Sequence, residues 1–154
     1  MAVRGTPKTT PPDLGWVRIG AYNIPPGDSI SLHAQGNEVR CLATVGSGGS
    51  QFAITTGSVV THDVSNKLYG DWDGTALRAG LLSGSLFSGT RTTPYGSWSN
   101  PYINVGLAQP NQEINSVIGP VVSYDAPLSD ARRTLVNSAI DSNGATDLWT
   151  LFEE

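Results

Sequence analysis

The segment that decides the fold runs over Asn66–Leu82 and reads NKLYGDWDGTALRAGLL. Two short apolar pieces flank a polar turn over Gly70–Thr75. Within that turn, Asp73-Gly74 favours a tight reversal, because Asp tolerates a left-handed backbone and Gly has no Cβ to forbid one. The segment therefore predicts two short strands, with Trp72 held at the corner between them.

The composition around this segment indicates a β-rich fold. A chain of 154 residues is long enough for one domain with a core of its own. Its 18 Gly and 10 Pro disfavour long helices and favour short strands joined by turns. We expect a mostly β, single compact domain, a sandwich or barrel-like body with one short C-terminal helix and an extended N-terminal arm.

The charge content limits the possible partners. Only 14% of the residues are charged, against roughly 25% in an average domain. Such a surface is either covered by neighbouring chains or is the plain Ser/Thr surface of a β domain, and both interpretations stay open. A net charge of −4 argues against a nucleic acid as partner, because phosphate binding needs a basic face. The chain has no apolar run of the ~18 residues that a membrane helix needs, so no membrane partner is expected.

The chain contains a single cysteine, Cys41, so no intramolecular disulfide can form. Small secreted domains usually carry disulfides, and assembly in a reducing cytoplasm is therefore expected.

A hairpin is predicted over Ser29–Val45, with Gly36-Asn37 as its two-residue turn. Counting outward from the turn places six apolar residues on one face, because side chains alternate along a strand. Cys41 belongs to this face and is expected to be a small core residue, not a nucleophile. His33 falls on the other, polar face beside Arg40, where we expect a surface residue and not a ligand. The six apolar residues are Ile30, Leu32, Ala34, Val39, Cys41 and Ala43.

Further strands are expected where short apolar runs lie between turn residues. A long loop or two irregular strands should occupy Pro94–Gln112, which several prolines and glycines interrupt. The strand candidates are Trp16–Ile24, Gln51–Thr55, Ser58–His62, Ser85–Thr93 and Ile114–Tyr124.

A helix is predicted near residues 129–142, capped by Ser129 or Asp130. Its apolar residues Ala131, Leu135, Ala139 and Ile140 recur at the spacing of one helical face.

The tail at residues 147–154 follows this helix and is strongly apolar, so we expect it to pack on the body or on a subunit neighbour. The candidate contacts with the body or an oligomer partner are Trp72, Trp149, Leu151 and Phe152.

Residues 1–14 are expected to form an extended arm, separate from a β-rich body at residues 15–154. Pro7, Pro11 and Pro12 exclude a helix there and remove backbone donors. A segment this polar buries too little apolar surface to become ordered alone. We expect contacts with the β-rich body or, preferably, with a neighbouring chain to order it. The candidate residues for contact with that neighbour are Ala2, Val3, Arg4, Thr6, Lys8, Thr9 and Thr10.

No sequence motif indicates catalysis or a cofactor. The chain lacks the nucleophile elbow, the phosphate-binding loop and the paired-histidine metal motif, and we expect neither an enzyme nor a resident cofactor. Asp71-Trp72-Asp73-Gly74 has the acid-x-acid spacing of calcium loops, but Leu82 stands where such a loop needs Glu. An acidic turn is therefore expected, without a metal. Tyr95, Trp98 and Tyr102 could stack on sugar rings or pack a long loop onto the core.

The Asn66–Leu82 segment resembles the central segment of the lambda-type phage head decoration proteins. That family has a Lys-Leu-Val piece, a Trp-Asp-Gly-Thr turn and an Ala-Val-Gly-Ile-Leu strand. This chain departs from the family where Gly70 and Asp71 extend the turn, and the Ser29–Val45 hairpin has no evident counterpart in it. The matching residues are Lys67, Leu68, Trp72, Asp73, Gly74, Thr75, Ala79, Gly80, Leu81 and Leu82.

The resemblance implies a β-tulip-like body and a non-enzymatic virion structural protein on the capsid exterior. By the same resemblance, the protein would form a homotrimer, bind the major capsid protein and cement the assembled shell, with the arm adding strand-like contacts. Two alternatives remain: a carbohydrate- or receptor-binding module of a phage particle that uses Tyr95, Trp98 and Tyr102, or a neck or tail component.

Overall fold

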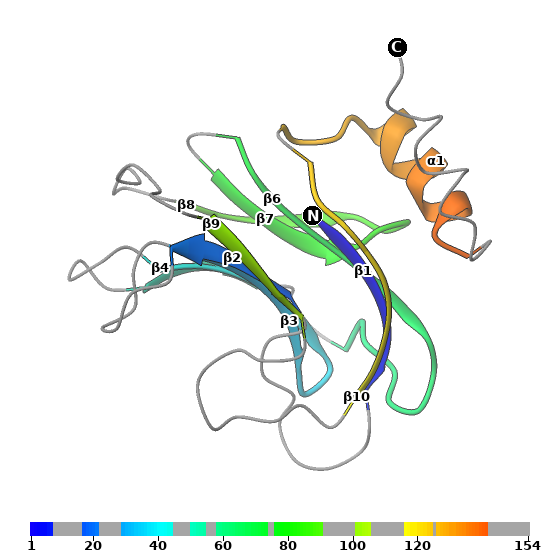
Figure 1. The fold of residues 1–154 in the computed structure, drawn as a ribbon. Helices are drawn as coiled ribbons and strands as arrows, with labels where there is room; N and C mark the ends of the chain where they lie inside the picture. Colours follow the sequence, from blue (N-terminus) through cyan, green and yellow to red (C-terminus); the bar gives the residue numbers. More distant parts are fainter. Residues whose placement is uncertain are drawn as a thin grey trace.

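Two five-stranded sheets and one helix make up the described part of the chain (Figure 1). The structure is a computed structural model that describes residues 1–7, 17–21, 29–44, 50–54, 58–73, 76–90, 101–105, 116–124 and 126–141. The protein is mostly β with one short helix, as the composition predicts.

The first sheet, called sheet 1 below, is antiparallel, and the N-terminal strand lies inside it. Its strands, in order across the sheet, are β10 (Ser116–Val122), β1 (Ala2–Pro7), β6 (Asn66–Trp72), β7 (Ala76–Leu81) and β8 (Leu86–Thr90).

The second sheet, called sheet 2, is also antiparallel and contains the Ser29–Val45 hairpin. Its strands, in order, are β5 (Ser50–Ile54), β4 (Glu38–Thr44), β3 (Ser29–Gln35), β2 (Val17–Ala21) and β9 (Pro101–Val105).

The elements form three layers, with sheet 1 between sheet 2 and helix α1 (Asp130–Ala139) (Figure 1). One core lies between the two sheets and includes Val3, Leu32, Cys41, Leu68 and Leu77. A second core lies between sheet 1 and α1, and it consists of Ala2, Tyr69, Leu82, Leu128, Val136 and Ile140. β1 and β6 are thus buried on both faces, and alternate residues of each of these strands enter different cores.

The predicted separate arm is wrong for residues 1–7, because Ala2–Pro7 forms β1 in the interior of sheet 1. β1 pairs with β10 on one side and with β6 on the other, so neither of its edges is free. Ala2 and Val3 are completely buried. Ladder hydrogen bonds on both sides, together with these two apolar side chains, offset the ordering cost that the polar composition suggested. The other predicted arm residues, Lys8, Thr9 and Thr10, lie outside the described residues.

The β3–β4 hairpin has the predicted register throughout its described part, Ser29–Thr44. Leu32 pairs with Cys41, and Ala34 pairs with Val39, around a turn in which Gly36 takes a φ of 57°. This left-handed value is one that glycine adopts without steric cost. The apolar face enters the core between the sheets, and burial raises the pKa of the Cys41 thiol to about 12. Cys41 is therefore a core residue, as predicted.

The prediction of His33 as a surface residue is wrong, since only 6% of it is exposed. It does lie on the face opposite the core, directly across from Arg40. β3 is the central strand of sheet 2, with β4 and β5 on one side and β2 and β9 on the other. Side chains on a central strand are shielded by their neighbours on both sides, which the sequence of a single hairpin does not reveal.

Most of the other predicted strands are present within a few residues of the expected bounds. Residues 58–62 are the exception, because they form an irregular segment and a turn, although Ser58–His62 was predicted as a strand. Here Val59 and Val60 both donate backbone hydrogen bonds to the Asn37 carbonyl, at 2.9 Å each. Pro101–Val105 is a regular strand, β9, inside the segment predicted as a loop or two irregular strands.

Helix α1 begins as predicted, with the Ser129 hydroxyl accepting a hydrogen bond from the Arg132 backbone N–H at 3.3 Å. The helix buries Val136, and Ile140 at its C-cap is buried beside it. Leu135, predicted on the apolar face, is instead 52% exposed. The predicted stop at Asn143-Gly144 lies outside the described residues.

Candidate functional site

Apart from the N-terminal residues, most of the side chains predicted to bind sugars or to contact the body or an oligomer partner lie outside the part of the chain that the structure describes. This holds for Trp149, Leu151, Phe152, Tyr95 and Trp98. Tyr102 belongs to β9, where only its backbone is described. The exception is Trp72, which is half-buried at the end of β6 and packs against the core between the sheets.

The β6–β7 hairpin turns later in the chain than expected. Its turn was predicted over Gly70–Thr75, but Gly70, Asp71 and Trp72 are paired strand residues of β6. The turn closes where Asp73 N–H donates to the Ala76 carbonyl at 3.2 Å, and where Ala76 N–H donates to Asp73 Oδ1 at 2.8 Å. Asp73 therefore has the predicted turn-forming role, while Asp71 belongs to the sheet.

Gly70 allows the two hairpins to approach closely. A Cβ placed on Gly70 would lie 3.0 Å from Cys41 Sγ and 3.0 Å from Leu32 Cδ1, both on the β3–β4 hairpin. The Gly70 carbonyl also accepts a hydrogen bond of 2.8 Å from the Met1 ammonium, which is buried. Burial lowers the pKa of this ammonium to about 6. Gly70 thus joins β1, β6 and the opposite sheet at one point.

On the other face of β6, Asp71 is the centre of a buried polar cluster. Its carboxylate accepts two hydrogen bonds from the Arg78 guanidinium, at 2.7 Å from Nε and 3.0 Å from Nη2. It also accepts one at 2.5 Å from the Tyr69 hydroxyl. That hydroxyl in turn accepts a hydrogen bond at 2.8 Å from the Leu128 backbone N–H. We call Tyr69, Asp71 and Arg78, with this backbone N–H, the Asp71 cluster.

The electrostatics of the Asp71 cluster favour structure over reactivity. Burial, and then the hydrogen bond to Asp71, raise the pKa of Tyr69, so its hydroxyl stays protonated as a donor. The hydrogen bond to Asp71 likewise raises the pKa of Arg78. Each charged group therefore has its partner inside the cluster. The arrangement fastens the segment that precedes α1 onto sheet 1, and it leaves no base poised to accept a proton.

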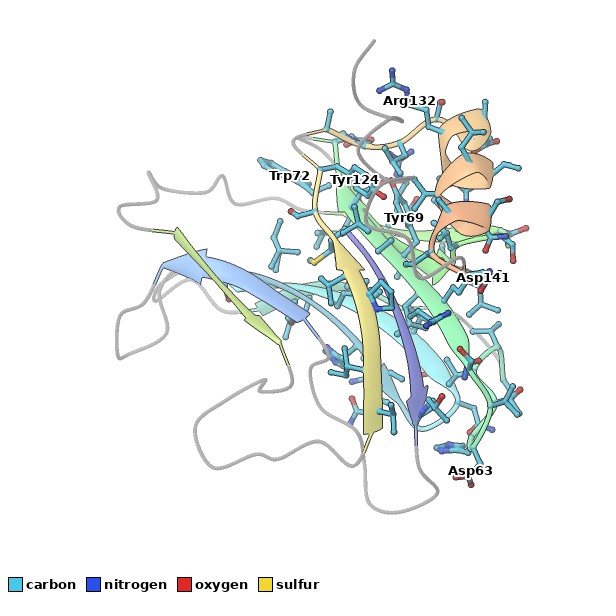
Figure 2. The ribbon with its side chains drawn as sticks, turned by 45° about the vertical axis from the view of Figure 1, so that its right-hand side comes forward. Asp63, Tyr69, Trp72, Tyr124, Arg132 and Asp141 are labelled. Atoms are coloured by element: carbon cyan, nitrogen blue, oxygen red, sulfur yellow. The ribbon has the colours of Figure 1, made fainter. Side chains whose placement is uncertain are left out.

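Basic side chains also attach α1 itself to sheet 1, and two residues that they contact, Tyr69 and Asp141, lie near α1 in Figure 2. Arg133 Nη1 donates to the carbonyls of Leu82 at 3.2 Å and Gly84 at 3.0 Å, and its guanidinium lies 5.7 Å from the centre of the Tyr69 ring. Lys67 Nζ donates to the Asn137 carbonyl at 2.8 Å and forms an ion pair with Asp141. Lys67 thus binds a carbonyl in the last turn of α1, where helix carbonyls lack backbone partners, and Arg133 binds carbonyls of the turn after β7.

Two polar side chains of the β3–β4 hairpin have nitrogens that make no hydrogen bond. His33 Nδ1 and Arg40 Nε are both buried and have no hydrogen-bond partner. Arg40 Nη2 lies 3.8 Å from Glu38 Oε2, an ion pair that does not involve Nε. We call His33 and Arg40 the His33 pair. The sequence indicated their placement opposite each other, but not their burial.

Within the described ranges, no group of three or more His, Cys, Asp or Glu side chains could hold a metal ion. The Asp71 carboxylate accepts hydrogen bonds from the Arg78 guanidinium, and Asp73 Oδ1 accepts one from the Ala76 backbone N–H. The only helix of the described segments, α1, has ten residues and is too short to cross a membrane.

Comparisons of the chain with models of known protein families and with characterised proteins found no match for it.

Proposed function

We propose that the protein is a non-enzymatic structural component of a phage particle that decorates and cements the capsid shell. The observation that carries the proposal is the place of the Asn66–Leu82 segment in the fold. This segment, which resembles the decoration proteins, forms the β6–β7 hairpin in the middle of sheet 1. Its side chains contribute to both cores, so the resemblance falls on the part that organises the fold.

The resemblance residues have structural reasons to be where they are. Leu68, Ala79 and Leu82 are buried core residues, and Asp73 closes the turn. A Cβ on Gly80 would lie 2.6 Å from the Ser85 carbonyl oxygen, so this position requires glycine. Because this hairpin depends on residues that match those of the decoration proteins, we propose that the segment has the same architecture as in that family. The same architecture supports the same role.

In this proposal the folded body, not a free N-terminal strand, docks on the capsid protein. β1 has no free edge, because strands on both sides occupy its hydrogen-bonding groups. β10 does lie at an edge of sheet 1, but its pairing with β1 shifts near Gly119-Pro120. A proline and a register shift interrupt the row of donors that an added strand would need. Side-chain contacts of the body are therefore the proposed basis of attachment.

The experiment is cosedimentation of the purified protein with empty shells assembled from the major capsid protein of the same phage. The proposal expects saturable binding at a fixed ratio to capsid subunits, with trimers by analytical ultracentrifugation and shells that resist higher temperatures. Absence of binding to shells, combined with binding on a glycan array, would favour the carbohydrate-binding alternative instead.

Two exposed apolar residues on separate elements can identify the docking face. Val117 on β10 is 63% exposed and Leu135 on α1 is 52% exposed. Val117→Lys and Leu135→Lys place a charge on different sides of the body with little effect on either core. If one variant binds shells at least tenfold more weakly while the other binds normally, the weakened one marks the docking face. Normal binding by both excludes both positions from the interface.

A further inference from the structure

We propose that the His33 pair forms a binding site for a small oxyanion, a carboxylate or phosphate group, on the face of sheet 2 that points away from the core. This inference is independent of the proposed function. It rests on two buried nitrogens, His33 Nδ1 and Arg40 Nε, that have no hydrogen-bond partner.

The register places the two side chains next to each other on one face of sheet 2. His33 and Arg40 are directly paired across β3 and β4. Side chains of such a pair start about 4.5–5.5 Å apart at Cβ and project from the same face of the sheet. The Arg40 Nε–H, together with the imidazole when its Nδ1 carries a proton, can therefore bond to one ligand that lies between them. An oxyanion suits this arrangement, because it has several acceptor oxygens and Arg40 supplies a positive charge.

The burial of the two nitrogens favours a bound ligand in physical terms. An unpaired polar group away from water costs about 1–3 kcal/mol, and proteins normally satisfy such groups with protein atoms, ordered water or an ion. Only 6% of His33 is exposed, whereas about a third of the Arg40 side chain is open to solvent. The partly open Arg40 gives a small ligand a way to reach the enclosed imidazole.

The charges around His33 support an anion in preference to a cation. Arg40 faces His33 from β4, and its charge, after burial, helps to lower the pKa of His33 to about 4. Glu38, also on β4, forms an ion pair with Arg40 at 3.8 Å from Nη2. A bound anion would offset the repulsion between Arg40 and a protonated imidazole, so its binding should tighten as the pH falls.

The test uses the full chain and the imidazole NMR signals of its two histidines, His33 and His62. Sodium phosphate, acetate and chloride are titrated at matched ionic strength at pH 7 and pH 5. We expect phosphate or acetate to shift the His33 signals saturably, more tightly at pH 5, with His62 as the internal reference. A response to acetate alone identifies a carboxylate site, and a response to phosphate alone identifies a phosphate site.

Variants decide whether the His33 pair is responsible. Arg40→Gln should weaken the binding at least tenfold, and Arg40→Lys should weaken it as well, because lysine keeps the charge but lacks Nε. Arg132→Gln, at an exposed position on α1, is the matched control and should bind normally. Unchanged His62 signals show that each variant is folded. If chloride acts like the oxyanions, or if Arg40→Gln and Arg132→Gln behave alike, the proposal is overturned and water fills the site.

Discussion

The β6–β7 and β3–β4 hairpins differ in what lies on their outer faces. Both hairpins send alternate apolar residues into the core between the sheets, where Gly70 meets Cys41. On its outer face, β6–β7 carries the Asp71 cluster, in which the carboxylate binds both Arg78 and Tyr69. The outer face of β3–β4 carries the His33 pair, with two nitrogens that have no partner.

This difference separates two uses of buried polar groups. A network whose members satisfy one another contributes to stability and to a unique arrangement. Polar groups that are buried without hydrogen-bond partners lower the free energy of unfolding. They become favourable when a ligand supplies the missing hydrogen bonds. The comparison therefore assigns the Asp71 cluster to structure and the His33 pair to binding, and the following variants test that assignment.

The largest effect is expected from Asp71→Ala, which leaves the Arg78 guanidinium and the Tyr69 hydroxyl without their acceptor. Removing one member of a buried ion pair costs about 3–5 kcal/mol. We expect the lower part of this range, because the Arg78 side chain is 29% exposed and can reach water. Urea unfolding measures the loss. Asp130→Ala is the control, since the Asp130 side chain is 94% exposed and its pair with Arg133 should contribute less than about 1 kcal/mol.

A second prediction concerns the pH dependence of stability through His33, whose pKa is lowered from 6.5 to about 4. Above pH 6.5 the imidazole is neutral in both states and carries no penalty. As the pH falls from 6.5 to 4, the unfolded chain gains a proton that the folded chain does not, so stability is lost. The full loss is about 3 kcal/mol without a bound oxyanion.

Urea unfolding between pH 7 and pH 4 checks this prediction against two variants. His33→Gln should remove the His33 part of the pH dependence, while His62→Gln should keep it. Parallel curves for wild type and His33→Gln would contradict the prediction. Carboxylates also titrate toward pH 4, but they are common to all three proteins and cancel in the difference.

Gly70→Ala tests the place where the two hairpins meet. Its new methyl group would lie 3.0 Å from the Cys41 sulfur and from a Leu32 methyl carbon. Overpacking of this kind costs about 1–3 kcal/mol. Gly84→Ala is the matched control, because its Cβ would make an ordinary contact of 3.5 Å with Leu81. Equal melting temperatures for the two variants would show that the sheets separate more easily than the packing suggests.

The smallest effect is expected from Lys67→Met, which removes the cation that binds the Asn137 carbonyl and Asp141. The loss should be about 1 kcal/mol and confined to the attachment of α1. Hydrogen exchange should quicken in the amides of α1 but not in those of β3 and β4. Equally faster exchange in α1, β3 and β4 would mean that the helix and the two sheets unfold together, which would contradict the prediction. Arg132→Met is the control for the loss of a surface charge.

The sequence alone predicts those parts of the fold in which a local pattern is sufficient. The β3–β4 register follows from Gly36-Asn37 and from strict alternation, and the start of α1 follows from Ser129. Both depend on residues close together in the chain.

The features that the sequence did not predict depend on contacts between residues far apart in the chain. Met1 pairs with Gly70, 69 residues later, so no local pattern marks β1 as an interior strand. The burial of His33 requires β2 and β5 beside its hairpin. Asp71 was assigned to a turn because Asp and Gly are typical of turns, although its neighbours in space are Tyr69 and Arg78. Polar residues such as Asp71 and His33 were therefore mispredicted because neighbouring strands of their sheets surround them.

The most direct test of the difference between the hairpins is a pair of double-mutant cycles, measured by urea unfolding at pH 7 in chloride buffer. One cycle combines Asp71→Ala with Arg78→Ala, and the other combines His33→Ala with Arg40→Ala. The account predicts a coupling energy of about 1–3 kcal/mol for the first cycle and less than about 0.5 kcal/mol for the second. Equal couplings, or a larger one between His33 and Arg40, would contradict the assignment of one site to structure and the other to binding.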